Sequence, residues 1–220
     1  MFTGHYSFSF AGKSVAGSSE KRIPLWLLFL AVQWIDVMWS IFVLLGIEKV
    51  RIVSGFTASN ALDLYYMPYT HSLAGVLCWS ALAYVACQLF PQLRGPRTGL
   101  IIAGAVFSHW ILDLIVHIPD LALYDSVGKM GFGLWNHRAG AFTLEMAVLF
   151  GGAALFYRTA AHKARLASFV VFLAALQIFG MFFFPLPKSD HAAAMTALGS
   201  YIVLALMAWW VDSSPPTLRS

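Results

Sequence analysis

The sequence has few charged residues. Only 11% of its 220 residues are Asp, Glu, Lys or Arg, whereas 60% are hydrophobic and the mean hydropathy is +0.73. A soluble globular protein has about 25% charged and roughly 45–50% apolar residues. This shortage of charge excludes a soluble enzyme, a disordered chain and a nucleic-acid-binding domain. The composition predicts an integral membrane protein.

Cysteine is also scarce. The two cysteines, Cys78 and Cys87, lie in one apolar stretch. Two cysteines so placed exclude a fold built on several disulfides. We expect both to be small, buried side chains.

Long apolar runs make up most of the chain. A helix needs about 20 mostly apolar residues to cross a bilayer core about 30 Å thick. Runs of this length alternate with charged or proline-containing breaks, which predicts an all-helical bundle of six transmembrane helices. The predicted spans are 23–46, 69–90, 98–118, 139–157, 166–184 and 193–211. Two connections, 47–68 and 119–138, are long for a compact bundle and are candidates for functional loops.

The first 17 residues are too short for a further span, and they lack the basic start of a signal peptide. We expect a short helix that dips into the bilayer. His5 would then lie near mid-membrane, with Lys13, Lys21 and Arg22 at the cytoplasmic surface.

Lys and Arg are more frequent in alternate connections, on the side of residues 13–22. The positive-inside rule therefore predicts a cytoplasmic C-terminus in a multispan protein of the bacterial inner membrane. We expect one integral membrane domain over 1–220. Its functional core would lie in about 1–150, followed by two generic spans in about 166–211.

Ionisable residues are costly in hydrocarbon, so those inside the predicted spans indicate function. In span 98–118, His109, Asp113 and His117 recur every four residues. This spacing puts them on one helix face, with neighbours about 5–6 Å apart. Imidazole and carboxylate groups are zinc ligands, so this face predicts a metal site, with His117 either a ligand or a group beside it. The alternative is a His–Asp pair that only fixes helix packing.

Three other ionisable residues are predicted to reach the same depth. Asp36, His71 and Glu145 lie in three different spans, and the alternating direction of these spans puts all three near His109 in the outer half of the bilayer. Glu145 could orient a ligand histidine or act as a general base. Each also has a structural alternative: Asp36 could pair with another helix, His71 could belong to an interfacial tyrosine belt, and Glu145 could hold a Trp or Tyr.

Several short motifs resemble the membrane-bound metal-dependent hydrolases of bacteria, a family likened to the zinc-dependent phospholipase C helical fold. The motifs are the start Met-Phe-Thr-Gly-His5-Tyr, Asp36 in the first apolar run, Tyr69-Thr70-His71-Ser72-Leu73 and Ser108-His109-Trp110-Ile111-Leu112-Asp113. Residues 45–52, 117–121 and 133–136 resemble a subgroup of these proteins. The resemblance covers about residues 1–150.

The resemblance implies a metal site, most simply for zinc. Its implied ligands are His5, Asp36, His71, His109 and Asp113. The wider family carries a further Asp and His just after the first Asp, where this chain has Val37-Met38-Trp39, so we expect a single ion. We assign His117, Asp120 and Asn136, which lie in or beside the motifs, to the groups that surround the ligands.

The resemblance also implies hydrolysis of an ester or phosphoester in a lipid or lipid-linked substrate. A metal-activated water would attack, and Asp113 or Glu145 would act as general base. Membrane lipids are then the expected partners. Two alternatives stay open: a proton or metal-ion path of a transporter, and a non-catalytic subunit in which His71 with His109 or His117 holds haem or the cluster only packs helices.

Overall fold

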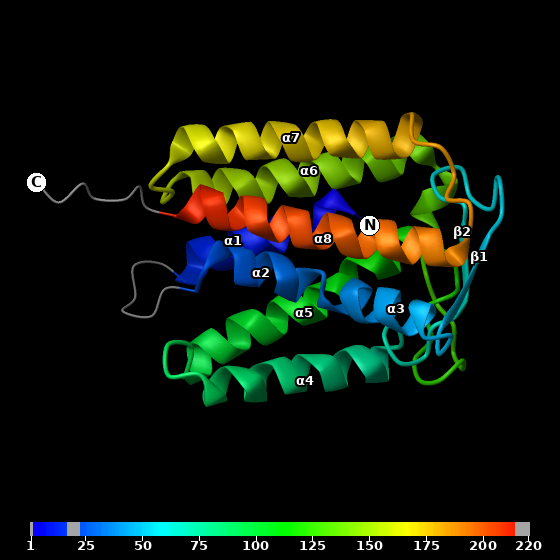
Figure 1. Ribbon diagram of the computed structural model, residues 1–220, viewed down its shortest axis with the longest axis horizontal. Coiled ribbons are helices and arrows are strands. Elements are labelled where there is room, and N and C mark those ends of the chain that lie inside the picture. The colour runs from blue at the N-terminus through cyan, green and yellow to red at the C-terminus, as the bar shows by residue number, and fades with distance from the viewer. Residues whose placement is uncertain (1, 17–22, 214–220) are drawn as a thin grey trace, which may run out of the picture.

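Helices make up most of the molecule. The computed structural model describes residues 2–16 and 23–213, so the predictions at Lys21 and Arg22 lie outside the described residues. Within these ranges it contains eight α-helices and one two-stranded antiparallel sheet (Figure 1). The elements are α1 (Tyr6–Ala16), α2 (Leu25–Val32), α3 (Trp34–Leu44), β1 (Lys49–Ile52), β2 (Leu62–Tyr66), α4 (Leu73–Leu89), α5 (Pro96–Val116), α6 (Arg138–Tyr157), α7 (Lys163–Phe182) and α8 (Asp190–Asp212), with short 3-10 helices at Thr3–His5 (η1) and Leu134–Asn136 (η2). The predicted helical class is confirmed, and the small sheet lies in the long connection 47–68, for which no strands were predicted.

Four helices are long and apolar enough to cross a membrane, namely α5, α6, α7 and α8. Helices α2 and α3 would together make a fifth span, although they are bent by 55° where they meet. Helix α4 has 17 residues and is short for a span. These helices are consistent with a membrane protein, but the predicted number of six spans is not confirmed for the described residues.

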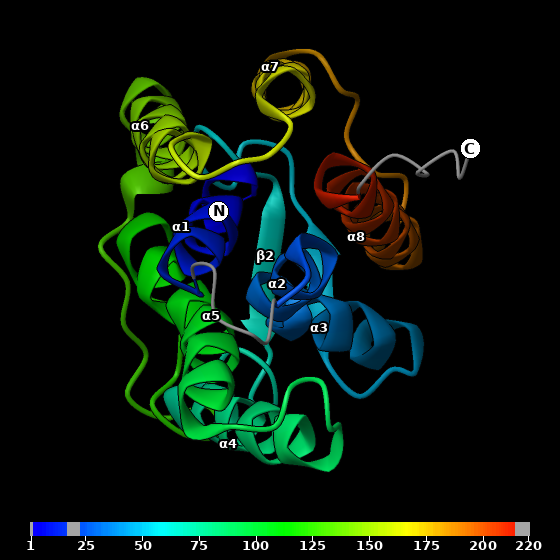
Figure 2. The same cartoon turned by 90° about the vertical axis from the view of Figure 1, so that its left-hand side faces the viewer.

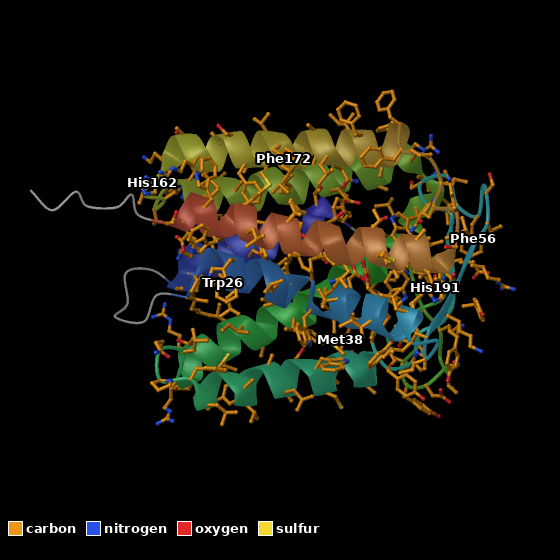
Figure 3. All side chains as sticks on the ribbon, in the orientation of Figure 1. Trp26, Met38, Phe56, His162, Phe172 and His191 are labelled. Carbon is orange, nitrogen blue, oxygen red and sulfur yellow. The ribbon has the colours of Figure 1, made fainter. Side chains whose placement is uncertain are left out.

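The long helices run in alternating directions. The α4–α5 and α6–α7 connections lie at one end of the bundle with the last residues of α8 (Figure 1). The β1–β2 hairpin and the α7–α8 connection lie at the other end. Apolar side chains cover the outer faces, as at Phe172 on α7, which is 41% exposed (Figure 3). Exposed apolar faces of this kind suit contact with lipid.

The first predicted span is broken at Gln33, which ends α2 and begins α3. Its φ of −102° and ψ of 6° interrupt the helical ladder, and the bend turns the Val32 carbonyl toward α5. The freed carbonyl accepts a hydrogen bond from His109. A break of this kind is tolerated inside a bundle because a neighbouring group satisfies the backbone.

Helix α1 lies inside the bundle, against α2, α5 and α6 (Figure 2). Gly152 on α6 allows this close approach, because a Cβ atom there would lie 2.3 Å from the Ser7 carbonyl oxygen. Near the end of α1, Lys13 Nζ forms an ion pair with Asp212 Oδ2 at 2.6 Å. These contacts bring the N-terminal residues into the protein core.

Helix α4 packs chiefly against α5, so one of its faces is open. Cys78 lies on that open face and is exposed, whereas Cys87 is buried. The expectation that both cysteines are buried was therefore wrong for Cys78. Periodicity gave no indication that α4 would have a single main neighbour.

Candidate metal centre

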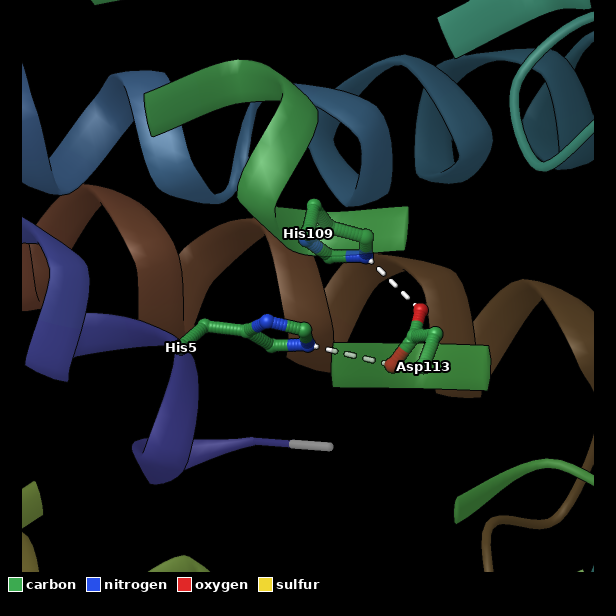
Figure 4. Close-up of side chains that lie close together, drawn as sticks. All are labelled: His5, His109 and Asp113. Carbon is green, nitrogen blue, oxygen red and sulfur yellow. Dashed lines mark ion pairs between the residues drawn. The ribbon is translucent and has the colours of Figure 1, made fainter. Parts of the chain in front are cut away.

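Helix α5 supplies the middle of the site. His109 and Asp113 lie one turn apart on it, and His109 Nε2 is 3.0 Å from Asp113 Oδ2. His5 approaches from η1, with its Nε2 3.2 Å from Asp113 Oδ1 (Figure 4). The His5 and His109 rings stack with centroids 3.9 Å apart. The Asp113 carboxylate thus contacts two imidazoles from distant parts of the chain.

Asp36 and His71 join the cluster from two further segments. Asp36 lies on α3 just after the break, and His71 lies just before α4. His71 Nε2 is 3.2 Å from Asp36 Oδ1 and 3.8 Å from Asp113 Oδ2. His109 Nε2 is 3.5 Å from Asp36 Oδ1. The fold therefore brings together all five residues that the resemblance implied as ligands.

In His109 and His117, the Nδ1 atom, which points away from the Asp113 carboxylate, donates a hydrogen bond. His109 Nδ1 lies 2.8 Å from the Val32 carbonyl oxygen. His117 Nδ1 lies 2.9 Å from Asp120 Oδ1. A carbonyl or carboxylate oxygen only accepts, so Nδ1 carries the proton in both imidazoles.

His71 is held through a hydroxyl group. Its Nδ1 lies 2.8 Å from Thr70 Oγ1, and this hydroxyl donates to Glu48 Oε2 at 2.6 Å. Because the hydroxyl proton is directed at Glu48, the Thr70 oxygen accepts from His71. Links from a carboxylate to the far nitrogen of a histidine commonly orient metal-binding imidazoles.

The Nε2 atoms of these three histidines face the Asp113 carboxylate, and those of His71 and His109 also face the Asp36 carboxylate. A neutral imidazole with its proton on Nδ1 has a lone pair on Nε2. The three Nε2 atoms lie 3.0 to 3.8 Å from oxygens of Asp36 and Asp113. Lone pairs and carboxylates repel at this distance, so positive charge is needed between them. Two protonated imidazoles would balance the two carboxylates, and so would one divalent cation bound between them.

The spacing of the donor atoms fits a metal ion. Zinc holds nitrogen and oxygen ligands tetrahedrally at about 2.0–2.2 Å, so neighbouring ligand atoms lie about 3.3–3.6 Å apart. Two overlapping sets of three residues each offer one donor atom per residue, and within a set these atoms lie within 4.8 Å of one another. They are His5 with His109 and Asp113, and Asp36 with His71 and His109. These buried His and Asp residues could hold a metal ion.

Glu145 and Gln177 fix the N-terminal turn that carries His5. Glu145 Oε2 accepts from the backbone N–H groups of Phe2 at 3.0 Å and Gly4 at 3.2 Å. Gln177 Oε1 accepts from the Thr3 hydroxyl at 3.1 Å. The first N–H groups of a helical segment have no partner within it, and a carboxylate satisfies them well. Glu145 therefore holds the backbone turn that carries His5.

Glu48, which follows the first predicted span, was not among the predicted site residues. Its Oε1 accepts from the Tyr69 and Thr70 N–H groups at 2.8 and 2.9 Å. Burial raises the pKa of Glu48, and the hydrogen bonds from Thr70 and Tyr69 oppose that shift. A carboxylate next to the end of a predicted span could have indicated a site residue. The sequence did not show that its partner would be Thr70.

Tyr201 and Trp135 were also not predicted as site residues. The Tyr201 hydroxyl on α8 donates to Asp36 Oδ2 at 2.8 Å. Trp135 packs on His117, with ring centroids 4.2 Å apart. Its neighbour Asn136, expected near the ligands, is exposed, so the 3-10 turn η2 directs Trp135 and not Asn136 toward the site.

A cavity of about 270 Å³ adjoins the cluster. Asp36, His71, Asp113, His117 and Glu145 line its inner end. The connection between the strands, and helices α7 and α8, form the other walls. A small polar substrate group could therefore reach the candidate ligands.

Comparison of the chain with protein-family models, with curated protein sequences and with solved structures gives no match. The geometry of the site and the motifs in the sequence are therefore the observations that bear on function.

Proposed function

We propose that the cluster binds one divalent cation, most simply zinc. The observation that carries this proposal is the convergence of the Nε2 atoms of His5, His71 and His109 on the Asp36 and Asp113 carboxylates, at distances of 3.0 to 3.8 Å. Imidazole and carboxylate together suit zinc better than magnesium or calcium, which prefer oxygen. We take His5, Asp36, His71, His109 and Asp113 as its ligand set.

We further propose that the protein is a membrane hydrolase that cleaves an ester or phosphoester of a lipid or lipid-linked substrate. A bound cation would polarise the substrate oxygen and lower the pKa of water to about 7. Glu145 lines the cavity without being in the ligand set, so it is the carboxylate available to accept the proton of the attacking water. The motif resemblance supports this reaction class, and the positive-inside rule supports the inner membrane with a cytoplasmic C-terminus.

The metal content of the purified protein tests the first proposal. Wild type, His109→Ala and Asp113→Ala would be purified in detergent, loaded with zinc, desalted and analysed for metals. We expect about one zinc per chain in wild type and a loss of most of it in both variants. His191→Ala is the matched control, because His191 is exposed and pairs only with its neighbour Asp190 among the described contacts. Folded wild type without metal would contradict the proposal.

Hydrolysis is tested next on the zinc-loaded protein. Neutral lipid esters, phospholipids and lipid phosphates would be supplied in mixed micelles, and products followed by mass spectrometry. We expect turnover that zinc restores after chelation and that Glu145→Gln lowers by about 10²–10⁴-fold, the usual contribution of a general base. Metal binding without turnover of any of these classes would leave the metal site standing and contradict the hydrolase proposal.

One observation favours a proton path as the second candidate. A chain of hydrogen bonds and close contacts runs from Glu48 through Thr70 and His71 to Asp113, and on through His117 to Asp120. Such chains carry protons in membrane proteins. Proteoliposomes loaded with a pH-sensitive dye distinguish the candidates: a proton leak that Thr70→Val abolishes would favour the path, and tight liposomes would favour the metal centre.

A further inference from the structure

The cavity beside the cluster extends away from it between α7 and α8. Helix α7 packs chiefly on α6, and α8 on α2 and α3. Gly180 and Met181 of α7, and Ala193 and Ala197 of α8, line the cavity between these two helices. Three of these four residues have very small side chains, so they leave room where larger residues would fill the space.

Gly180 marks the outer limit of this space. It lines the cavity and is also exposed on the surface of α7. A Cβ atom at Gly180 would meet nothing within 4 Å. The surrounding surface is apolar, because Phe179, Phe182 and Phe183 are each 45–68% exposed. The mouth of the cavity therefore opens on a face of a candidate membrane span that suits lipid.

The remaining cavity wall combines apolar side chains with polar residues, among them Ser59 and Asn60. Ser59 and Asn60, from the connection between β1 and β2, line it above the cluster. None of the described lining residues is Lys or Arg, whereas Asp36, Asp113 and Glu145 contribute carboxylates. A charged phosphate head group would meet three carboxylates and no Lys or Arg of the described lining there, whereas an uncharged ester could accept hydrogen bonds from the Asn60 amide and the Ser59 hydroxyl.

We infer that the space between α7 and α8 is a lateral opening through which an uncharged acyl ester reaches the cluster from the bilayer. The acyl chain lies across Gly180 and between Ala193 and Ala197. The ester group lies beside Asn60 and the candidate ligands. This inference rests on the proposed function for the reaction, but the position of the opening is independent of the metal.

A photoreactive lipid tests the opening without requiring metal or turnover. The probe is a monoacylglycerol with a diazirine in its acyl chain, incorporated with the full-length protein into phosphatidylcholine nanodiscs. After irradiation, labelled residues are mapped by mass spectrometry. We expect labels on the inner wall at Met181 and Tyr201, and we expect Gly180→Leu to reduce these labels by about tenfold, because the added side chain fills the mouth.

Gly199→Leu is the matched control. Gly199 is an exposed glycine of α8 that does not line the cavity, and a Cβ atom there also meets nothing within 4 Å. Both substitutions increase helix propensity, so a difference between them reports the opening and not helix stability. Equal labelling of the inner wall in both variants and wild type, or no labelling there in wild type, would overturn the inference.

Competition by unlabelled lipids tests the charge of the substrate. Unlabelled monoacylglycerol should reduce labelling of the inner wall, and the same acyl chain on glycerol phosphate should need about tenfold more lipid for the same reduction. Equal competition would overturn the assignment to an uncharged ester. Zinc analysis of the same samples tests the metal proposal separately. A failure of the lateral opening can therefore be distinguished from a failure of the metal site.

Discussion

The two ends of the bundle are packed by different chemistry. In the half around Phe10, Phe29 and Phe169, aromatic rings lie 5.3–6.5 Å apart and are almost fully buried. In the half around His109 and Asp113, the interior is filled by imidazoles and carboxylates beside a cavity. Each close ring contact stabilises the fold in the aromatic half. In the ionisable half, the carboxylates and unprotonated imidazole nitrogens repel one another unless a proton or a metal ion supplies positive charge. The first half thus supports the fold, and the second is suited to binding.

The largest effect should come from the aromatic half. Phe169→Ala removes a ring that is 1% exposed and contacts both Phe10 and Phe29. We expect about 3 kcal/mol of destabilisation from the cavity left behind. The measurement is the denaturation midpoint of metal-free protein in detergent. Phe172→Ala, on the same helix but 41% exposed, is the control and should change little.

The Phe169→Ala variant also tests whether the aromatic half and the ionisable half are independent of each other. We expect folded Phe169→Ala to bind zinc as wild type does at low temperature, because Phe169 contacts no residue of the cluster among its described ring contacts. A large fall in zinc affinity without a fall in stability would mean that the aromatic half shapes the site directly.

The ligand face of α5 could be predicted because it depends on local geometry alone. Residues four apart lie on one helix face wherever the helix is, so His109, Asp113 and His117 were placed together from their spacing. His71 was placed near His109 by the direction of its span, and the resemblance named it and His5 as ligands; folding brings both to the Asp113 carboxylate. Whether any of them binds a metal stays a prediction.

The features that were not predicted depend on contacts between distant segments. At the break beside Gln33, the Val32 carbonyl accepts a hydrogen bond from His109 on α5. The Tyr201 hydroxyl on α8 donates a hydrogen bond to Asp36 on α3. Hydrophobic periodicity does not predict which residues of distant segments will form hydrogen bonds. The hairpin was missed for a related reason, since its strands Lys49–Ile52 and Leu62–Tyr66 are short and stand in a loop-like stretch.

A smaller effect should follow from loosening one histidine in the ionisable half. Thr70→Val removes the hydroxyl that connects His71 Nδ1 to Glu48. We expect zinc affinity, measured by competition with a chromophoric chelator, to fall about 10–100-fold, the usual cost of losing a group that orients a ligand. Thr159→Val is the matched control, because the hydroxyl of Thr159 donates to the local Phe156 carbonyl at the far end of the bundle and to no other described group. Unchanged affinity would mean that His71 needs no such orientation or is not a ligand.

The smallest effect should come from Tyr201→Phe, which removes one hydrogen bond to Asp36 Oδ2 and little else. The Asp36 side chain is 16% exposed and lines the cavity, so water can replace the lost hydroxyl. We expect a loss of about 1 kcal/mol, or roughly fivefold in zinc affinity by the same chelator competition. Tyr157→Phe, at an exposed position on α6, should leave the affinity unchanged. A loss as large as that of Thr70→Val would mean that water does not reach Asp36, and that α8 closes the ionisable half as tightly as the aromatic rings close the other.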